Sequence, residues 1–189
     1  MKSSSYIIEL IVAGAGAMVW LILILFIFVG YDWISLPLIS EPALVIVFSP
    51  FLYIAGVVTD RLVDNLFDRW FKENYKNPGF LGKEEYIIAR TKIYTRSDSL
   101  RELIEYSKMR IRICRAWAFN SMMIMIAGDL FVLLSHSPFE LWSQRWGAFA
   151  GITVSFLLFS FLSFRAWRSL SLKEAEYLAI QSKVLDEMR

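Results

Sequence analysis

Three aspartates spaced four residues apart are the groups in this sequence that could do chemistry together. Asp60, Asp64 and Asp68 stand in the stretch GVVTDRLVDNLFDRW, residues 56–70. Because residues four apart share one face of an α-helix, their carboxylates would line a single acidic face. Such a face could guide a cation or a proton, or it could form one side of an ion-pair ladder.

Cations at helical spacing in a later stretch could neutralise this acidic face. If the two stretches form antiparallel helices, each aspartate lies level with one basic residue. The expected pairs are Asp60 with Arg115, Asp64 with Arg112, and Asp68 with Lys108. Charges at the edge of a membrane are costly alone and tolerable in pairs. The pattern favours a structural stalk that keeps two helices in register, with an ion or proton path and unpaired solvated charge as the alternatives.

Two polar residues interrupt an apolar run at residues 116–134. Asp129 has no charged residue within eight positions, and a carboxylate inside a membrane is by default a candidate functional group. The structural alternative is a hydrogen bond to a Ser or Thr on a neighbouring helix, or a position close to the outer interface. Asn120 lies on the same run, and we expect it to form a hydrogen bond between helices.

The composition excludes several classes of active site. The chain has one cysteine, Cys114, and one histidine, His136, which excludes an internal disulfide and clustered His/Cys metal sites. No Ser/His/Cys arrangement and no phosphate-binding loop is recognisable. The sequence therefore predicts no enzyme, no metal and no cofactor.

Hydrophobic content places the chain among membrane proteins. Of its 189 residues, 57% are hydrophobic and 16% aromatic, and the mean hydropathy is +0.49. A bilayer crossing needs about 20 apolar residues, and four runs approach that length: 7–29, 43–60, 116–134 and 146–164. The first run is too long for a signal-peptide core and has no cleavage site after it. We expect an all-α, four-span transmembrane bundle with helical cytoplasmic extensions.

The distribution of Lys and Arg predicts the orientation. Thirteen of the 20 lie between residues 61 and 115, none in the 31–42 loop and one in the 135–145 loop. Because basic loops stay in the cytoplasm, both termini and the middle region would face inward, in a cell inner membrane. The predicted units are a transmembrane hairpin over 1–62, a cytoplasmic helical region over 63–112, a second hairpin over 113–166 and a C-terminal helix over 167–189.

Local signals add detail to these elements. Small residues at 13–17, AGAGA, would let helix backbones approach closely, and Gly147 and Gly151 repeat the pattern weakly. Glu9 is expected to face lipid headgroups. A short helix is predicted over 83–94, and Ser99 should begin the next one through a capping box. Residues 171–189 resemble an amphipathic helix that packs on the other cytoplasmic helices or mediates self-association.

Basic residues in the middle region predict a binding surface for lipid or a partner. The residues are Lys83, Arg90, Lys92, Arg96 and Arg101. Anionic lipid of the inner leaflet is the first expectation, followed by a cytosolic protein or a nucleotide. Interleaved glutamates and a net charge of only +2 argue against nucleic acid.

Two function classes follow from this pattern, and both imply a homo-oligomer because one small subunit cannot line a wide pore. One is a non-enzymatic signalling or structural subunit that binds a soluble partner through residues 70–110 and 170–189. The other is a small channel or transporter with a path past Asp129 and the acidic face.

In size and topology the chain resembles the small four-span membrane subunits of bacterial anti-phage defence systems of the Kiwa type. The resemblance covers most of the chain and rests on span count, orientation and the charged stalk. It implies a membrane sensor or scaffold that works with a cytosolic effector.

Overall fold

The computed structural model of the protein describes residues 2–30, 42–74, 83–134 and 142–187. Within these ranges the regular structure is entirely helical, which confirms the predicted all-α class. The helices are α1 (Lys2–Val29), α3 (Pro42–Asn74), α4 (Lys83–Arg96), α5 (Asp98–Leu134) and α6 (Trp142–Glu187).

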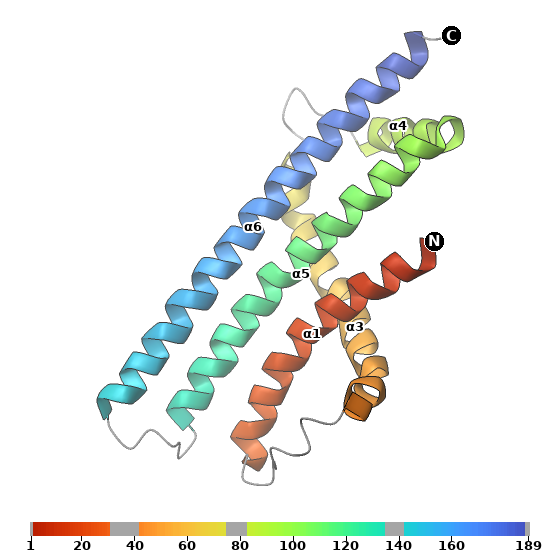
Figure 1. The fold of residues 1–189 in the computed structure, drawn as a ribbon. Coiled ribbons are helices and arrows are strands. Elements are labelled where there is room, and N and C mark those ends of the chain that lie inside the picture. Colours follow the sequence, from red (N-terminus) through yellow and green to blue (C-terminus); the bar gives the residue numbers. More distant parts are fainter. Residues whose placement is uncertain (1, 31–41, 75–82, 135–141, 188–189) are drawn as a thin grey trace.

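Three long helices lie side by side, and a fourth crosses them. Figure 1 shows α1, α5 and α6 in a row, with α3 crossing behind at a clear angle and α4 packed near the start of α5. The pair α5 and α6 makes the most extensive helix contact, followed by α1 with α3 and α1 with α5. The ends of α1 and α5 and the start of α6 lie at one end of the molecule, and α4 and the C-terminus lie at the other.

Three helices are long and apolar enough to cross a membrane. They are Ile7–Val29 in α1, Asp98–Leu134 and Ser143–Val184. These spans agree with the predicted class of membrane protein. The fourth predicted run, 43–60, lies in α3 and is not among the three.

Helices α5 and α6 are much longer than a bilayer is thick. At 1.5 Å per residue, the 37 residues of α5 extend about 55 Å and the 46 residues of α6 about 70 Å, against a hydrocarbon core of about 30 Å. The expected boundaries at 62/63, 112/113 and 166/167 all fall inside continuous helices. The separate C-terminal helix expected from residue 171 is likewise the end of α6, since residues 152–187 contain neither Gly nor Pro to end it.

The beginning of α5 differs from the predicted capping box. Ser97, not Ser99, supplies the side-chain cap, and its Oγ accepts a hydrogen bond from the Leu100 amide at 3.4 Å. The amide of Ser97 still bonds the carbonyl of Ile93, 3.1 Å away. The corner between α4 and α5 is therefore tighter than the sequence indicated, because one serine ends one helix and begins the next.

Two glycines allow α1 and α3 to cross at backbone contact. A Cβ atom on Gly14 would overlap the carbonyl oxygen of Leu52, and one on Gly56 would overlap that of Leu10. This close approach agrees with the expectation from the small residues at 13–17. By contrast, a Cβ on Gly147 or Gly151 would meet nothing within 4 Å.

A second small cluster joins α4 to the extended ends of α5 and α6. Ile93, Ile104 and Leu178 are fully buried against one another. We call the unit formed by α4, residues 98–112 of α5 and residues 171–187 of α6 the head. Its own apolar core shows that the head is a packed structure and not a set of solvated helix ends.

Asn120 joins α5 to α1, as the sequence predicts. The side chain has no exposed surface. Its Nδ2 donates to the carbonyl oxygen of Ala13 at 2.8 Å, and its Oδ1 accepts from Trp20 Nε1 at 3.3 Å. Both polar ends of the amide are satisfied, so Asn120 fixes the register of two helices inside the apolar region.

Candidate functional site

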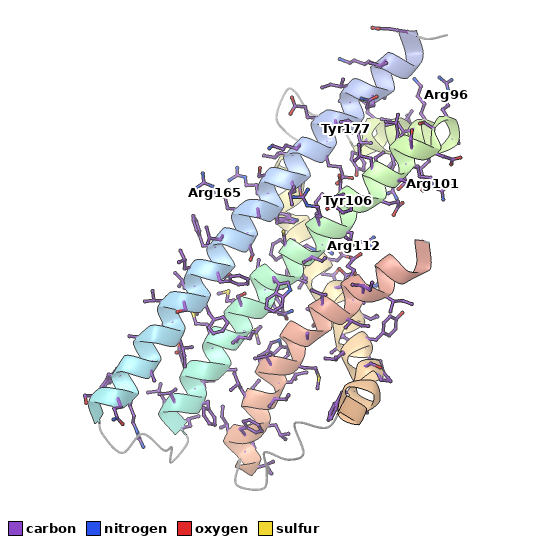
Figure 2. The ribbon with its side chains drawn as sticks, in the orientation of Figure 1. Arg96, Arg101, Tyr106, Arg112, Arg165 and Tyr177 are labelled. Atoms are coloured by element: carbon purple, nitrogen blue, oxygen red, sulfur yellow. The ribbon has the colours of Figure 1, made fainter. Side chains whose placement is uncertain are left out.

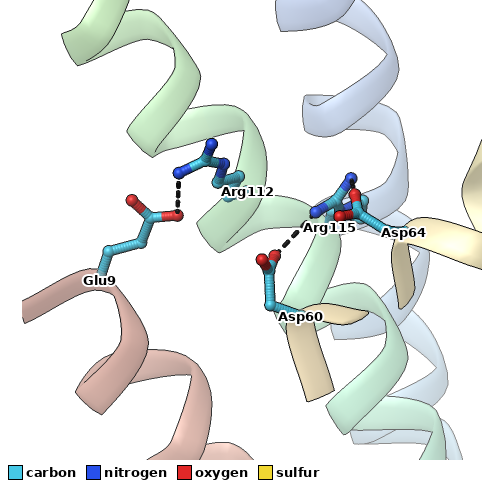
Figure 3. Close-up of polar contacts among 5 residues, drawn as sticks. All are labelled: Glu9, Asp60, Asp64, Arg112 and Arg115. Atoms are coloured by element: carbon cyan, nitrogen blue, oxygen red, sulfur yellow. Dashed lines mark hydrogen bonds and ion pairs between the residues drawn. The ribbon is translucent and has the colours of Figure 1, made fainter. Parts of the chain in front are cut away.

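Arg115 is the centre of the acidic ladder. Its Nη2 contacts Asp60 Oδ1 at 2.8 Å, in the register that the sequence predicts, and its Nη1 pairs with Asp64 Oδ1 (Figure 3). The fork geometry of a guanidinium lets one arginine bind two carboxylates one helical turn apart. Arg115 is 9% exposed, so the three charges form a half-buried group that joins α3 to α5.

The predicted pair of Asp64 with Arg112 is wrong. Arg112 turns toward α1, where its Nη1 lies 3.5 Å from Glu9 Oε1. The expectation that Glu9 faces headgroups is also wrong, because its side chain is buried. The predicted pairs came from the antiparallel alignment of two helices alone. In the structure α1 packs against both α3 and α5 and supplies Glu9 as a third carboxylate. The side chain of Asp68 lies outside the described residues, so its pairing with Lys108 stays a prediction.

Three cations surround the ring of Tyr94 in the head. Arg90, Arg101 and Lys108 lie 5.1, 5.4 and 5.6 Å from its centroid, within the range of cation–π attraction. The Tyr94 hydroxyl donates to Glu105. Burial and this hydrogen bond raise the pKa of Tyr94 above its usual value. Lys108 is thus placed in the head by an aromatic ring that the ladder pattern did not reveal.

A cavity of about 360 Å³ lies where the head meets the apolar part of the bundle. Four helices contribute to its wall, and the charged lining groups are four cations and two carboxylates. The lining residues are Asp64, Phe67, Tyr86, Arg90, Lys108, Ile111, Arg112, Arg115, Trp167, Ser171 and Glu174. This volume falls within the range of about 300–1,000 Å³ for small-molecule sites.

Burial shifts the titration of two groups in this wall, both outside the apolar runs 116–134 and 146–164. Desolvation, and next the positive charge of Arg90, lowers the pKa of Lys108 to about 8. Desolvation raises the pKa of Glu174, an effect that Lys108 opposes. Tyr86 donates to Glu174 Oε1 at 3.3 Å. The wall therefore holds like charges close together away from bulk water, which is typical of functional sites and also of structural ion-pair networks.

Two residues of the predicted basic surface, Arg90 and Lys92, are engaged in contacts within the protein. Lys92 Nζ donates to the carbonyl oxygen of Ser182 at 3.1 Å and so holds α4 against α6. Arg90 lines the cavity, and Arg96 and Arg101 lie at the corner of α4 and α5 (Figure 2). The side chain of Lys83 lies outside the described residues.

Sequence reasoning missed the three members of the cavity wall that α6 supplies, although a signal for them was present. Trp167, Ser171 and Glu174 are spaced by four and three residues, and Leu178 continues the same row. Such spacing predicts one helix face. The row was hidden because the helix was expected to begin only at residue 171.

Asp129 has the partner expected of a packing group. Thr153 Oγ1 on α6 lies 2.9 Å from Asp129 Oδ2 and 2.9 Å from the carbonyl oxygen of Phe149. A hydroxyl has one proton for these two acceptors. The other oxygen, Asp129 Oδ1, is buried and has no hydrogen-bond partner among the described residues.

Comparisons with protein-family models, with curated proteins and with solved structures found no match. Among the described residues, no group of three or more His, Cys, Asp or Glu side chains is placed to hold a metal ion. Function must therefore be inferred from the geometry of this chain.

Proposed function

We propose that the protein is a non-enzymatic, homo-oligomeric scaffold or sensor of the inner membrane that recruits or regulates a soluble cytosolic partner. The observation that carries this proposal is the continuity of α5 and α6 from their apolar runs into the packed head. A helix without a break transmits position from the membrane to the head, and that is what a membrane-anchored scaffold needs. The resemblance to defence subunits suggests anti-phage defence as the process.

Exposed apolar side chains on the head support a protein partner. Ile87, Ile88, Leu103, Tyr106 and Ile180 are each about half exposed or more. In the apolar runs such exposure is explained by lipid, but the head lies beyond those runs among charged residues. Exposed apolar groups rimmed by polar residues mark interaction sites.

Orientation, span number and self-association belong to the same proposal. The surplus of Lys and Arg between residues 61 and 115 favours a cytoplasmic head. With α3 as a fourth span, both termini face the cytoplasm, as the placement of α4 and the C-terminus at one end of the molecule also favours. The open space beside Gly147 and Gly151 leaves room for a second copy against α6.

Site-specific photo-crosslinking in cells tests the partner. With a crosslinking residue in place of Ile88, we expect adducts to a cytosolic protein, whereas the same residue at Leu158, in the apolar run of α6, should react only with lipid or membrane protein. Adding Ile87→Glu should lower the Ile88 adduct by about three-fold or more, because one buried apolar contact is worth about 1 kcal/mol or more. Adducts from Ile88 to lipid or to a second copy alone would reject a cytosolic partner and a cytoplasmic head together.

A small ion channel is the second candidate, and the buried Asp129 Oδ1 without a partner favours it. Asp129→Asn keeps a side chain of the same shape and supplies an amide donor to Thr153. If Asp129 is a packing group, the oligomer and its melting temperature should stay within the range of wild type, while Asp129→Leu should weaken assembly. Planar-bilayer recordings test the alternative. If wild type conducts ions and Asp129→Asn abolishes the conductance while the oligomer stays intact, the protein is a channel.

A further inference from the structure

We propose that the cavity between the head and the apolar bundle is a binding site for a phosphate-bearing anion. Arg90 and Lys108 face this cavity from α4 and α5, and Arg112 and Arg115 continue the basic wall from α5. Phosphate groups are bound by arginine and lysine because each oxygen accepts strong, charge-assisted hydrogen bonds.

The basic side of the wall exceeds its acidic side. Four cations and two carboxylates, Asp64 and Glu174, line the cavity, which gives a formal charge of +2 for the wall. Arg115 is neutralised by Asp60 and Asp64, and Arg112 has Glu9 behind it. The other two cations, Arg90 and Lys108, share Glu174 in the wall as a counter-charge, Lys108 also has Glu105 nearby, and the two cations repel each other. An anion between them would remove that repulsion.

Ser171 provides an independent observation that points to a ligand. The residue is 4% exposed and lines the cavity. Its Oγ is buried and has no hydrogen-bond partner among the described residues, whereas buried hydroxyls are nearly always paired. A phosphate oxygen in the cavity would accept the missing hydrogen bond.

The remainder of the wall specifies the rest of the ligand. Phe67, Ile111 and Trp167 give the wall an apolar part beside the cations. A ligand that fits has a phosphate joined to an apolar or aromatic portion. An anionic phospholipid headgroup with its glycerol meets this description, and so does a soluble nucleotide. The site would bind its ligand whether or not a cytosolic protein docks on the exposed residues of the head.

Two binding assays on the full-length protein distinguish the sources. Native mass spectrometry of detergent-solubilised protein compares added phosphatidylglycerol with phosphatidylcholine. Calorimetry in phosphatidylcholine nanodiscs measures ATP, with inorganic phosphate alone as the minimal probe. Selective retention of phosphatidylglycerol identifies a lipid ligand, and binding of ATP or phosphate identifies a soluble one, so either result supports the site.

Variants locate the binding in the cavity. Arg90→Gln and Lys108→Gln should each weaken binding about ten-fold or more, as expected for a charge-assisted hydrogen bond. Arg110→Gln makes the same charge change at an exposed position outside the lining and should stay within about two-fold of wild type by the weak effect of screened surface charge.

Ser171→Ala keeps the test valid if the charge variants fold poorly. Removing a buried hydroxyl that has no partner should leave the melting temperature unchanged or higher, yet it should weaken binding about three- to ten-fold through the lost hydrogen bond. The proposal is overturned if no phosphate probe binds wild type, or if the cavity variants bind as tightly as the Arg110 variant.

Discussion

Arg115→Met is expected to destabilise the protein by about 3–5 kcal/mol, the usual loss when one partner of a buried ion pair is removed. The reason is that Arg115 neutralises Asp60 and Asp64 at the same time. Methionine fills a similar volume, so the loss of stability would come from the two carboxylates left without a counter-charge and not from a cavity. Unfolding in mild detergent, followed by circular dichroism, measures the change.

Arg110→Met is the matched control, because Arg110 lies on the same helix, is exposed and has its guanidinium over the ring of Tyr106. It should change stability by less than about 1 kcal/mol. Restoring neutrality with Asp60→Asn and Asp64→Asn in the Arg115→Met background should recover much of the loss. Equal losses for Arg115→Met and Arg110→Met would show that Arg115 does not hold α3 to α5.

Gly14→Ala should be the second most damaging change, with a loss of about 1–3 kcal/mol or more from overpacking. Its Cβ would overlap the carbonyl oxygen of Leu52, which is backbone and cannot rotate away. Gly56→Ala should have a similar effect, since its Cβ would overlap the carbonyl of Leu10. Melting temperatures of the purified variants measure both.

Gly151→Ala makes the identical substitution where a Cβ meets nothing within 4 Å. Its melting temperature should stay the same or rise, because alanine has a higher helix propensity than glycine by about 1 kcal/mol. The close crossing of α1 and α3 would be refuted if Gly14→Ala and Gly151→Ala melted together.

The sequence predicts features that depend on one helix or on a pair of neighbours in the chain. The all-α class, the approach of glycines in α1 and the contact of Asp60 with Arg115 all belong to this group. The pairing of Arg112 with Glu9 could not be predicted in the same way, because it requires the position of a third helix. The antiparallel register of α3 and α5 predicts which residues lie at the same height on the two helices. The packing of α1 beside them decides that Arg112 points toward Glu9.

The cavity was hidden for a related reason. Its wall consists of residues from α3, α4, α5 and α6. The cations come from α4 and α5 and lie far in the sequence from Ser171 and Glu174. Spacing within α6 does place Trp167, Ser171 and Glu174 on one face. Which residues that face contacts depends on the corner at Ser97, where the chain turns so that α4 packs against α6. The sequence had predicted this helix start at Ser99 instead.

In the proposed membrane orientation, the unbroken course of α6 would let the helix act as a lever. Residues 165–187 continue the helix beyond its apolar run by about 35 Å at 1.5 Å per residue. If the bilayer thins or thickens, a rod of fixed length adjusts by tilting. A tilt of about 10° would sweep the far tip of α6 through about 6 Å, by the same helix geometry. A change of a few ångströms in lipid thickness would thus become a displacement of similar size on the water-exposed side, without a moving joint between them.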